Sequence, residues 1–233
     1  MKFKSQIVTQ ASGSIGGTTF AHNRAGMYMR ARSIPVNPSS TTQVERRSAM
    51  ASAVVHWGLM TEVQRSAWRT YAENVPVTDG FGDPQFLTGQ QMWIRSATIW
   101  SMLSVAMSTK YAAPIVFNMG DTGLITLTSI TAATNVAVVG IAGSPLWAAS
   151  AGNFLICQFG IPQNASLRFF KGPYRFGGAD EGNAVPITTG TFDSDDCDPP
   201  IDIGVGQRIF LRLRTIYSDG RLSAPIFLDG LAV

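Results

Sequence analysis

The sequence predicts an α+β protein in which an N-terminal arm and a small helical block precede a β-sandwich. Residues 11–38 are rich in glycine and in basic residues and end with two prolines. Residues 39–110 contain three capping-box patterns ahead of segments with helical spacing. Residues 111–233 change to period-two alternation interrupted by glycine and proline. We therefore expect an extended arm or hairpin over 1–38, a helical block over 39–110 and a β-sandwich over 111–233.

The composition favours a folded protein that packs against neighbours. Charged residues make up only 14% of the 233 residues and hydrophobic residues 45%, so the chain can build a core under a weakly charged surface. Residues 1–110 carry 11 Lys and Arg against 5 Asp and Glu, a net charge of +6. Residues 111–233 carry 7 against 10, a net charge of −3. Opposite charges favour contacts between neighbouring subunits, although two unrelated solvated faces would give the same count.

The arm is the segment that we expect to bind a partner. Turn-like stretches at 14–17 and 23–26 flank short strand-like pieces, which predicts either hairpin ribbons or an extended arm. Ribbons of this length are marginally stable alone in water, so a partner or the rest of the fold has to order them. The side chains expected at the interface are aromatic or basic: Phe20, Arg24, Tyr28, Arg30 and Arg32 in the arm, and Arg46 and Arg47 in the first helix.

Three helices are expected after the arm, over about 43–58, 62–73 and 89–106. Their starts are marked by capping boxes, which pair Thr42 with Glu45, Thr61 with Gln64, and Thr88 with Gln91. The third helix has a single charged residue and is expected to be buried, within its own domain or under a partner. Turn signals over 79–84 predict a small hairpin between the second and third helices.

The first expected helix has an apolar side of its own. Helical spacing places Val44, Ala51, Val54 and Val55 together, whereas Gln43, Glu45 and Arg46 lie elsewhere.

The β-region is expected to contain several short strands. They cover 124–130, 136–141, 153–159, 168–170, 208–217 and 225–228. The run QRIFLRLRTIYSDGRLSAPIF at 207–227 alternates and then turns at Asp219-Gly220. This run resembles the last two strands of fibronectin type III domains. The resemblance implies an immunoglobulin- or fibronectin-like sandwich that serves as a spacer or adhesion unit.

The sequence indicates no catalytic machinery, and we expect no enzyme activity and no cofactor. Its two histidines are His22 in the arm and His56 beside Trp57, where packing is the expected role. Cys157 and Cys197 show no paired spacing that would indicate a disulfide framework or a zinc site. The loop at 193–202 carries five aspartates, which suits a solvated loop, a docking site for a basic arm or a calcium site without EF-hand spacing.

Two binding functions remain open. A cationic arm with interleaved aromatics can follow a nucleic-acid backbone, but no recognised motif accompanies it, so we do not expect nucleic acid among the partners. A carbohydrate- or receptor-binding module would use stacking rings, for which the candidates are Trp147, Phe169, Phe170, Tyr174 and Phe176.

The order of motifs resembles a group of uncharacterised proteins of tailed bacteriophages and prophages. The shared pattern is Ser-Gly-x-x-Gly-Gly, Asn-Arg-x-Gly and Pro-x-Asn-Pro, followed by a helix and a Trp-containing second helix. Here it consists of Ser12, Gly13, Gly16, Gly17, Asn23, Arg24, Gly26, Pro35, Asn37, Pro38 and Trp68.

The resemblance implies a setting in the virion. We expect a virion structural protein, made in the host cytoplasm, that decorates or cements a capsid and contacts other virion proteins and further copies of itself. A tail or head-tail junction component is the alternative. The N-terminus lacks the apolar region of a secretory signal, and no window approaches about 18 uninterrupted apolar residues. No membrane is therefore expected among the partners.

Overall fold

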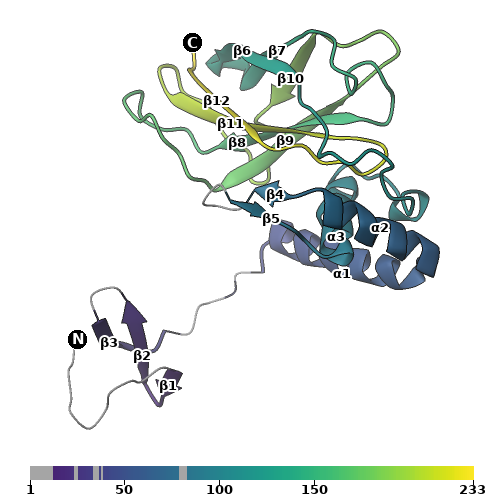
Figure 1. Cartoon of the computed structure of the whole chain (residues 1–233). Coiled ribbons are helices and arrows are strands. Elements are labelled where there is room, and N and C mark those ends of the chain that lie inside the picture. Colours follow the sequence, from purple (N-terminus) through teal and green to yellow (C-terminus); the bar gives the residue numbers. More distant parts are fainter. Residues whose placement is uncertain (1–12, 24–25, 34–36, 38, 79–82) are drawn as a thin grey trace. The chain divides into compact units, whose positions relative to one another are not determined.

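A computed structural model describes residues 13–23, 26–33, 37, 39–78 and 83–233. The chain divides into two compact units, Met1–Ser40 and Thr41–Val233, which are described separately (Figure 1). The structure confirms the α+β class, because the described residues form three α-helices and several antiparallel sheets.

The N-terminal unit contains one antiparallel sheet. Strands β1 (Gly13–Ile15), β2 (Thr18–Asn23) and β3 (Gly26–Ala31) pair in the order β1-β2-β3. Gly16 has φ 56° in the turn between β1 and β2, a conformation that glycine adopts without steric cost. Of the two expected alternatives, the described residues therefore show paired ribbons rather than an extended arm. The second predicted turn is centred on residues outside the described ranges, as are Pro35 and Pro38.

Three helices follow, and two of their starts are those predicted. Helices α2 (Glu62–Asn74) and α3 (Gly89–Met102) have the expected capping boxes at Thr61 and Thr88. The box predicted at Thr42 is wrong. Helix α1 (Thr41–Leu59) already includes this residue, and its hydroxyl donates a hydrogen bond of 2.7 Å to Asp198 instead.

The small hairpin predicted between α2 and α3 is present. Strands β4 (Val77–Thr78) and β5 (Pro84–Gln85) pair in antiparallel fashion. Its predicted Asp-Gly turn lies outside the described residues.

The remaining strands form two antiparallel sheets. Strands β6 (Leu124–Thr131), β7 (Val136–Ala142) and β10 (Thr189–Asp193) form one, in the order β10-β7-β6. Strands β8 (Phe154–Gly160), β9 (Tyr174–Glu181), β11 (Arg208–Ile216) and β12 (Ile226–Leu231) form the other, in the order β12-β11-β8-β9.

Most of the predicted strands are confirmed, but residues 168–170 lie in a loop, and β9 and β10 were not predicted. Both strands contain glycines that weaken the alternating pattern, and tertiary packing requires these glycines. A Cβ on Gly177 in β9 would lie 2.3 Å from the Phe159 ring, and one on Gly190 in β10 would lie 2.9 Å from the Asp180 carboxylate. The positions that obscure the strands in the sequence are thus the positions where other side chains approach the backbone.

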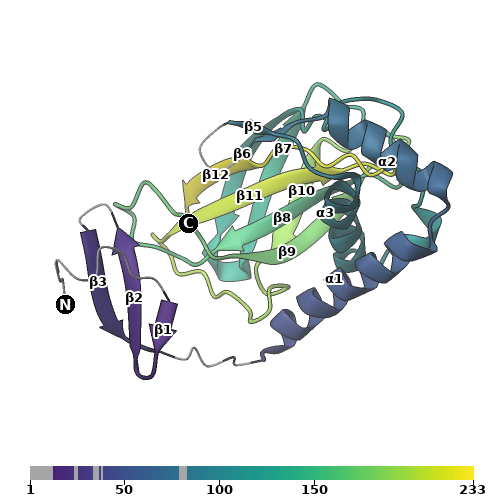
Figure 2. The same cartoon turned by 60° about the horizontal axis from the view of Figure 1, so that its bottom comes forward.

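The sheet β12-β11-β8-β9 has a hydrophobic core on each face. On one face, Ile209, Leu211 and Leu213 of β11 pack with residues of the other sheet, such as Val139 and Phe192. On the opposite face, Ile156 of β8 and Ile216 of β11 pack with the tryptophans of the helices, at the end of the sheet where β11 finishes. Figure 2 shows the three helices grouped at this end. The helices and the sheets therefore share a core, and the third helix is buried within its own unit.

Candidate functional site

The interface residues predicted in the arm do not lie on one face of the N-terminal sheet. Phe20 pairs with Met29, and Thr19 pairs with Arg30. Because successive side chains alternate, Phe20 lies on one face, while Tyr28 and Arg30 lie on the other. A partner that contacts all three side chains has to reach both faces of the sheet.

Two further predicted arm residues lie outside these strands. Arg32 follows β3, and its backbone N–H donates a hydrogen bond of 2.8 Å to the Gly17 carbonyl. Its side chain is exposed. Arg24 lies outside the described residues.

The N-terminal sheet is a single layer. Within the described residues of this unit, no helix or second sheet covers either face. Ile15 is 77% exposed, and Phe20 is only half-buried. A small sheet depends for its stability on a hydrophobic face or on packing against another element, and the described residues of this unit supply no second layer for such packing.

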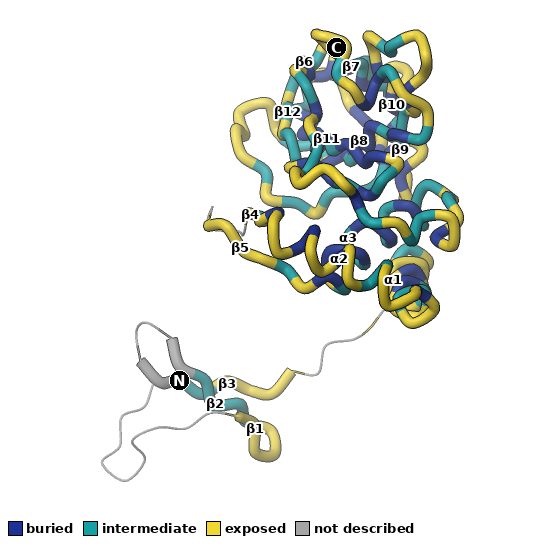
Figure 3. The backbone as a smooth tube through the Cα atoms, turned by 45° about the vertical axis from the view of Figure 1, so that its right-hand side comes forward, coloured by how far each residue is buried: buried dark blue, intermediate teal, exposed yellow. Residues whose placement is uncertain are grey.

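The outward side of α1 is apolar. It carries the exposed residues Val44, Met50, Val54, Val55 and Leu59, of which Val55 is 63% and Leu59 65% exposed. Figure 3 shows α1 largely in the colour of exposed residues. The valines do share one side of the helix, as the spacing indicates, but this side faces away from the core.

The buried residues of α1 are small. Ala49 and Ala53 are its buried residues, and the indole N–H of Trp93 in α3 donates a hydrogen bond of 3.0 Å to the Ala53 carbonyl. Only a small side chain leaves room for an indole to approach the helix backbone this closely. The side of α1 that packs on the core is therefore the side opposite the valines.

The two arginines of α1 have different environments. Arg47 precedes Ala51 by four residues and so lies on the outward side. Arg46 lines a groove of about 640 Å³ between α1, α3 and β9, together with Met102 and Phe176. Partial burial lowers the pKa of Arg46, an effect that the nearby Glu45 carboxylate opposes.

The acidic loop is tied to its own unit. Asp198 accepts the hydrogen bond from Thr42, Asp195 accepts one of 2.9 Å from the Asn135 amide, and Asp193 accepts one of 2.9 Å from the Asp195 N–H. Across the described ranges, no three His, Cys, Asp or Glu residues form a group that could hold a metal ion. The loop carboxylates thus bind the loop to the start of α1 and to the residue before β7. The geometry does not favour the alternative of a calcium site.

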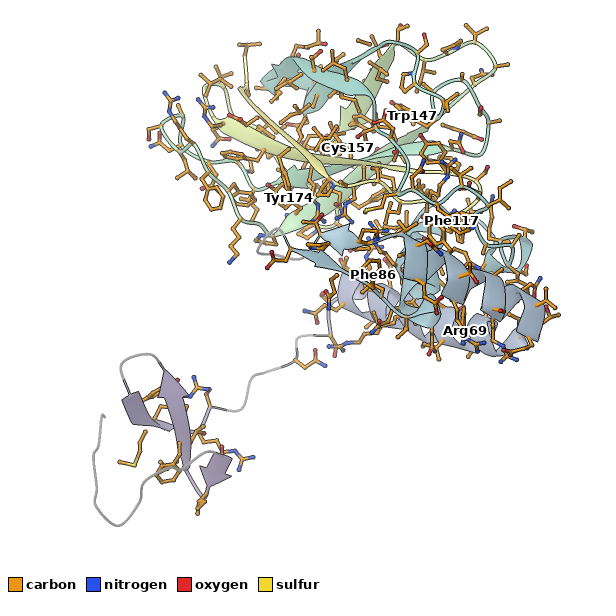
Figure 4. All side chains as sticks on the ribbon, viewed as in Figure 1. Arg69, Phe86, Phe117, Trp147, Cys157 and Tyr174 are labelled. Carbon is orange, nitrogen blue, oxygen red and sulfur yellow. The ribbon has the colours of Figure 1, made fainter. Side chains whose placement is uncertain are left out.

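Three of the five expected stacking rings converge on one pocket. Phe169, Phe170 and Tyr174 line a pocket of about 380 Å³ together with Phe210 and Phe227, two rings that sequence reasoning missed. Figure 4 shows Tyr174 at this site. Side-chain alternation along β11 and β12 could have identified the two missed rings. It places Phe210 and Phe227 on the face of the sheet that points away from the inter-sheet core.

The other two expected rings do not join the pocket. Trp147 is fully buried in the inter-sheet core, and its indole N–H donates a hydrogen bond of 2.8 Å to the Thr122 carbonyl. Phe176 lines the groove beside α1 instead.

The remaining chemically active side chains are used in packing. His56 Nδ1 lies 2.6 Å from the Tyr111 hydroxyl, in the packing role expected of it. Both cysteines are buried, and burial raises the pKa of Cys197 to about 12, which keeps this thiol protonated near neutral pH.

Comparisons with known proteins do not assign a family: no family model, curated protein or solved structure matches the chain. Among the helices in the described ranges, none has the length and apolar character needed to cross a bilayer.

Proposed function

We propose that this chain is a structural protein of a bacteriophage virion, most simply a capsid decoration or cement protein that docks through its N-terminal arm. One observation carries the proposal. The N-terminal sheet, which has no described second layer within its own unit, is followed in the chain by a helix whose outward side carries several exposed apolar side chains. Large exposed apolar surfaces mark sites of association.

The chemistry of both surfaces suits a subunit contact. Covering a half-exposed Val or Leu side chain contributes about 1 kcal/mol, so several such residues on α1 supply useful binding energy. Arg30 and Arg32 add guanidinium groups, which would pair with carboxylates of a neighbouring subunit in bidentate geometry. The partners proposed are a major capsid protein and further copies of this chain.

We also infer that residues 111–233 form an immunoglobulin- or fibronectin-like sandwich. Its seven strands are antiparallel, with the first, second and fifth in one sheet and the others in the second sheet. This distribution is that of a fibronectin type III domain, and the core between the two sheets supports the same assignment. Such a domain serves as a rigid outward-facing spacer on a particle.

A tail or head-tail junction component would use the same surfaces. The location within the particle distinguishes the two. Gold labelling of a tagged chain should mark the whole capsid shell for a decoration protein, and only the tail or the portal vertex for the alternative.

Deletion of residues 1–38 tests the docking role. Particles assembled with this truncated chain should lack it, as measured by mass spectrometry of purified particles, whereas the full chain is incorporated. Full incorporation of the truncated chain would contradict docking through the arm.

A further inference from the structure

Beyond its role in assembly, we propose that the pocket formed by Phe169, Phe170, Tyr174, Phe210 and Phe227 binds an acidic saccharide, a pyranose that carries a carboxylate. The proposal rests on the shape of the pocket, on the exposure of its rings and on the charges at its rim. It does not depend on the docking function.

The floor of the pocket is a built aromatic surface. The Phe170 ring stacks on Phe210 at 5.6 Å between centroids, and Tyr174 meets Phe170 edge-on at 5.4 Å. Gly160 makes this arrangement possible, since a Cβ at this position would lie 2.6 Å from the Phe170 ring. The Tyr174 hydroxyl donates a hydrogen bond of 3.2 Å to the Phe170 carbonyl, which fixes the loop over the strands.

Two rings at the mouth of the pocket are exposed to solvent. Phe169 is 74% exposed and Phe227 is 60% exposed. Neither ring is needed to fill the hydrophobic cores, so both are available to stack on a ligand. The volume of about 380 Å³ lies within the range of roughly 300–1,000 Å³ typical of small-ligand pockets.

The rim of the pocket is positively charged. Arg168 and Lys171 line it, and the Arg212 guanidinium lies 5.1 Å from the centre of the Tyr174 ring. The one lining carboxylate, that of Asp229, forms an ion pair with Arg208 and so does not offset these charges. In the described part of the chain, Arg168 and Lys171 have no ion-pair partner.

These features match an acidic sugar better than other ligands. One face of a pyranose presents C–H groups, which pack on aromatic rings, and its carboxylate would pair with the guanidinium of Arg168 and the ammonium of Lys171. A nucleic acid needs a basic groove that follows many phosphates, whereas here two cations, Arg168 and Lys171, line one compact pocket.

The test uses the full chain, labelled with a fluorophore, on an array of uronate- and sialate-bearing glycans beside their neutral counterparts. Binding to carboxylate-bearing pyranoses should be at least about tenfold stronger than to the neutral sugars, which is about 1.4 kcal/mol. Phe227→Ala should weaken this binding about tenfold. A double variant, Arg168→Gln with Lys171→Gln, should weaken binding of acidic sugars and leave that of neutral sugars unchanged.

A matched control is Phe117→Ala. Phe117 is 54% exposed and lies apart from Tyr174 in the same unit (Figure 4), so its loss should leave binding unchanged.

Three outcomes would overturn the proposal. They are absence of binding to any acidic glycan, equal binding of acidic and neutral sugars, and equal losses of binding in Phe117→Ala and Phe227→Ala. Tighter binding of a random oligodeoxynucleotide than of any glycan would also overturn it. The array contains no virion component, so failure here leaves the docking test unaffected.

Discussion

Gly220 shows how one residue without a side chain joins the helices to the sheet. It lies in the hairpin between β11 and β12 with φ 101°. A Cβ at this position would lie 2.8 Å from the Trp68 ring and 3.0 Å from the Trp100 ring. The Ser96 hydroxyl donates a hydrogen bond of 2.6 Å to the Gly220 carbonyl. The turn thus joins β11 to β12 and also packs against the core that the helices form.

Substitution of this residue separates backbone strain from packing. Gly220→Ala should lower the free energy of unfolding by about 2–4 kcal/mol, because positive φ and overpacking both act against the new methyl group. Gly206→Ala is the matched control, because its φ is 78° but no described atom lies within 4 Å of the added Cβ. It should cost only about 1–2 kcal/mol. Urea unfolding measures both values, and equal losses would show that packing against the tryptophans is unimportant.

A second residue, Tyr71, should make the free energy of unfolding depend on pH. Burial raises the pKa of Tyr71 from 10.0 to about 12, and its hydroxyl donates a hydrogen bond of 2.7 Å to the Asn118 carbonyl. Above pH 10 the unfolded chain loses this proton while the folded chain keeps it, so the folded state loses stability as pH rises towards 12.

Tyr71→Phe tests this directly. At pH 8 the variant should be about 1 kcal/mol less stable, because it lacks the hydrogen bond. The wild type should lose about 1 kcal/mol between pH 10 and pH 11 that the variant does not lose, because the unfolded tyrosine is already half titrated at pH 10. The two unfolding free energies should therefore converge as pH rises. A difference that stays constant from pH 8 to pH 11 would contradict the raised pKa.

At the scale of elements, α1 brings two alanines, Ala49 and Ala53, to its closest contact with the core, where the Trp93 indole reaches the Ala53 carbonyl. Trp57 adds a larger, partly buried side chain at this contact. Several large apolar side chains of the helix are exposed instead, which departs from the usual amphipathic pattern.

Polar substitution of the outer side should affect association and spare the fold. The double variant Val55→Gln with Leu59→Gln should change the free energy of unfolding by less than about 0.5 kcal/mol per site, since both side chains are exposed. Incorporation into particles should fall by about tenfold or more, as measured by quantitative mass spectrometry. The control is Val185→Gln with Val205→Gln, at two exposed valines of the β-region. Equal losses of incorporation in both double variants would count against α1 as a docking surface.

At the scale of the whole molecule, both hydrophobic cores belong to the second unit, whereas the proposed docking surfaces lie on both units. Both hydrophobic cores are built from residues of the second unit, and none of their members precedes Ala53. The first unit has one sheet and, among its described residues, no second layer. The chain therefore combines a unit that contains both cores with a smaller unit whose described residues form a single sheet.

Removal of residues 1–38 should leave the body folded. The melting temperature, followed by fluorescence of the buried tryptophans, should shift by less than about 2 °C, because a shift of that size corresponds to less than about 1 kcal/mol for a unit of this length. A much larger drop would show that the first unit contributes to the cores of the second and would make the incorporation test ambiguous.

Local patterns were sufficient to predict much of this fold. The capping boxes at Thr61 and Thr88, the alternation of β11 and the turn before β12 all depend on neighbours within a few residues. Only part of the pocket was predicted, since Phe169, Phe170 and Tyr174 are close in sequence, whereas Phe210 and Phe227 join them through strand pairing.

The sequence alone determined the fold class, the positions of α2 and α3, and most of the strands, because short-range hydrogen bonding and side-chain periodicity are properties of the local chain. Tertiary structure decided which side of α1 faces inward, where the glycine-rich strands β9 and β10 lie, and which aromatic rings share a pocket. These features depend on the space that distant side chains leave for one another, and such steric fit becomes defined only when the elements pack together.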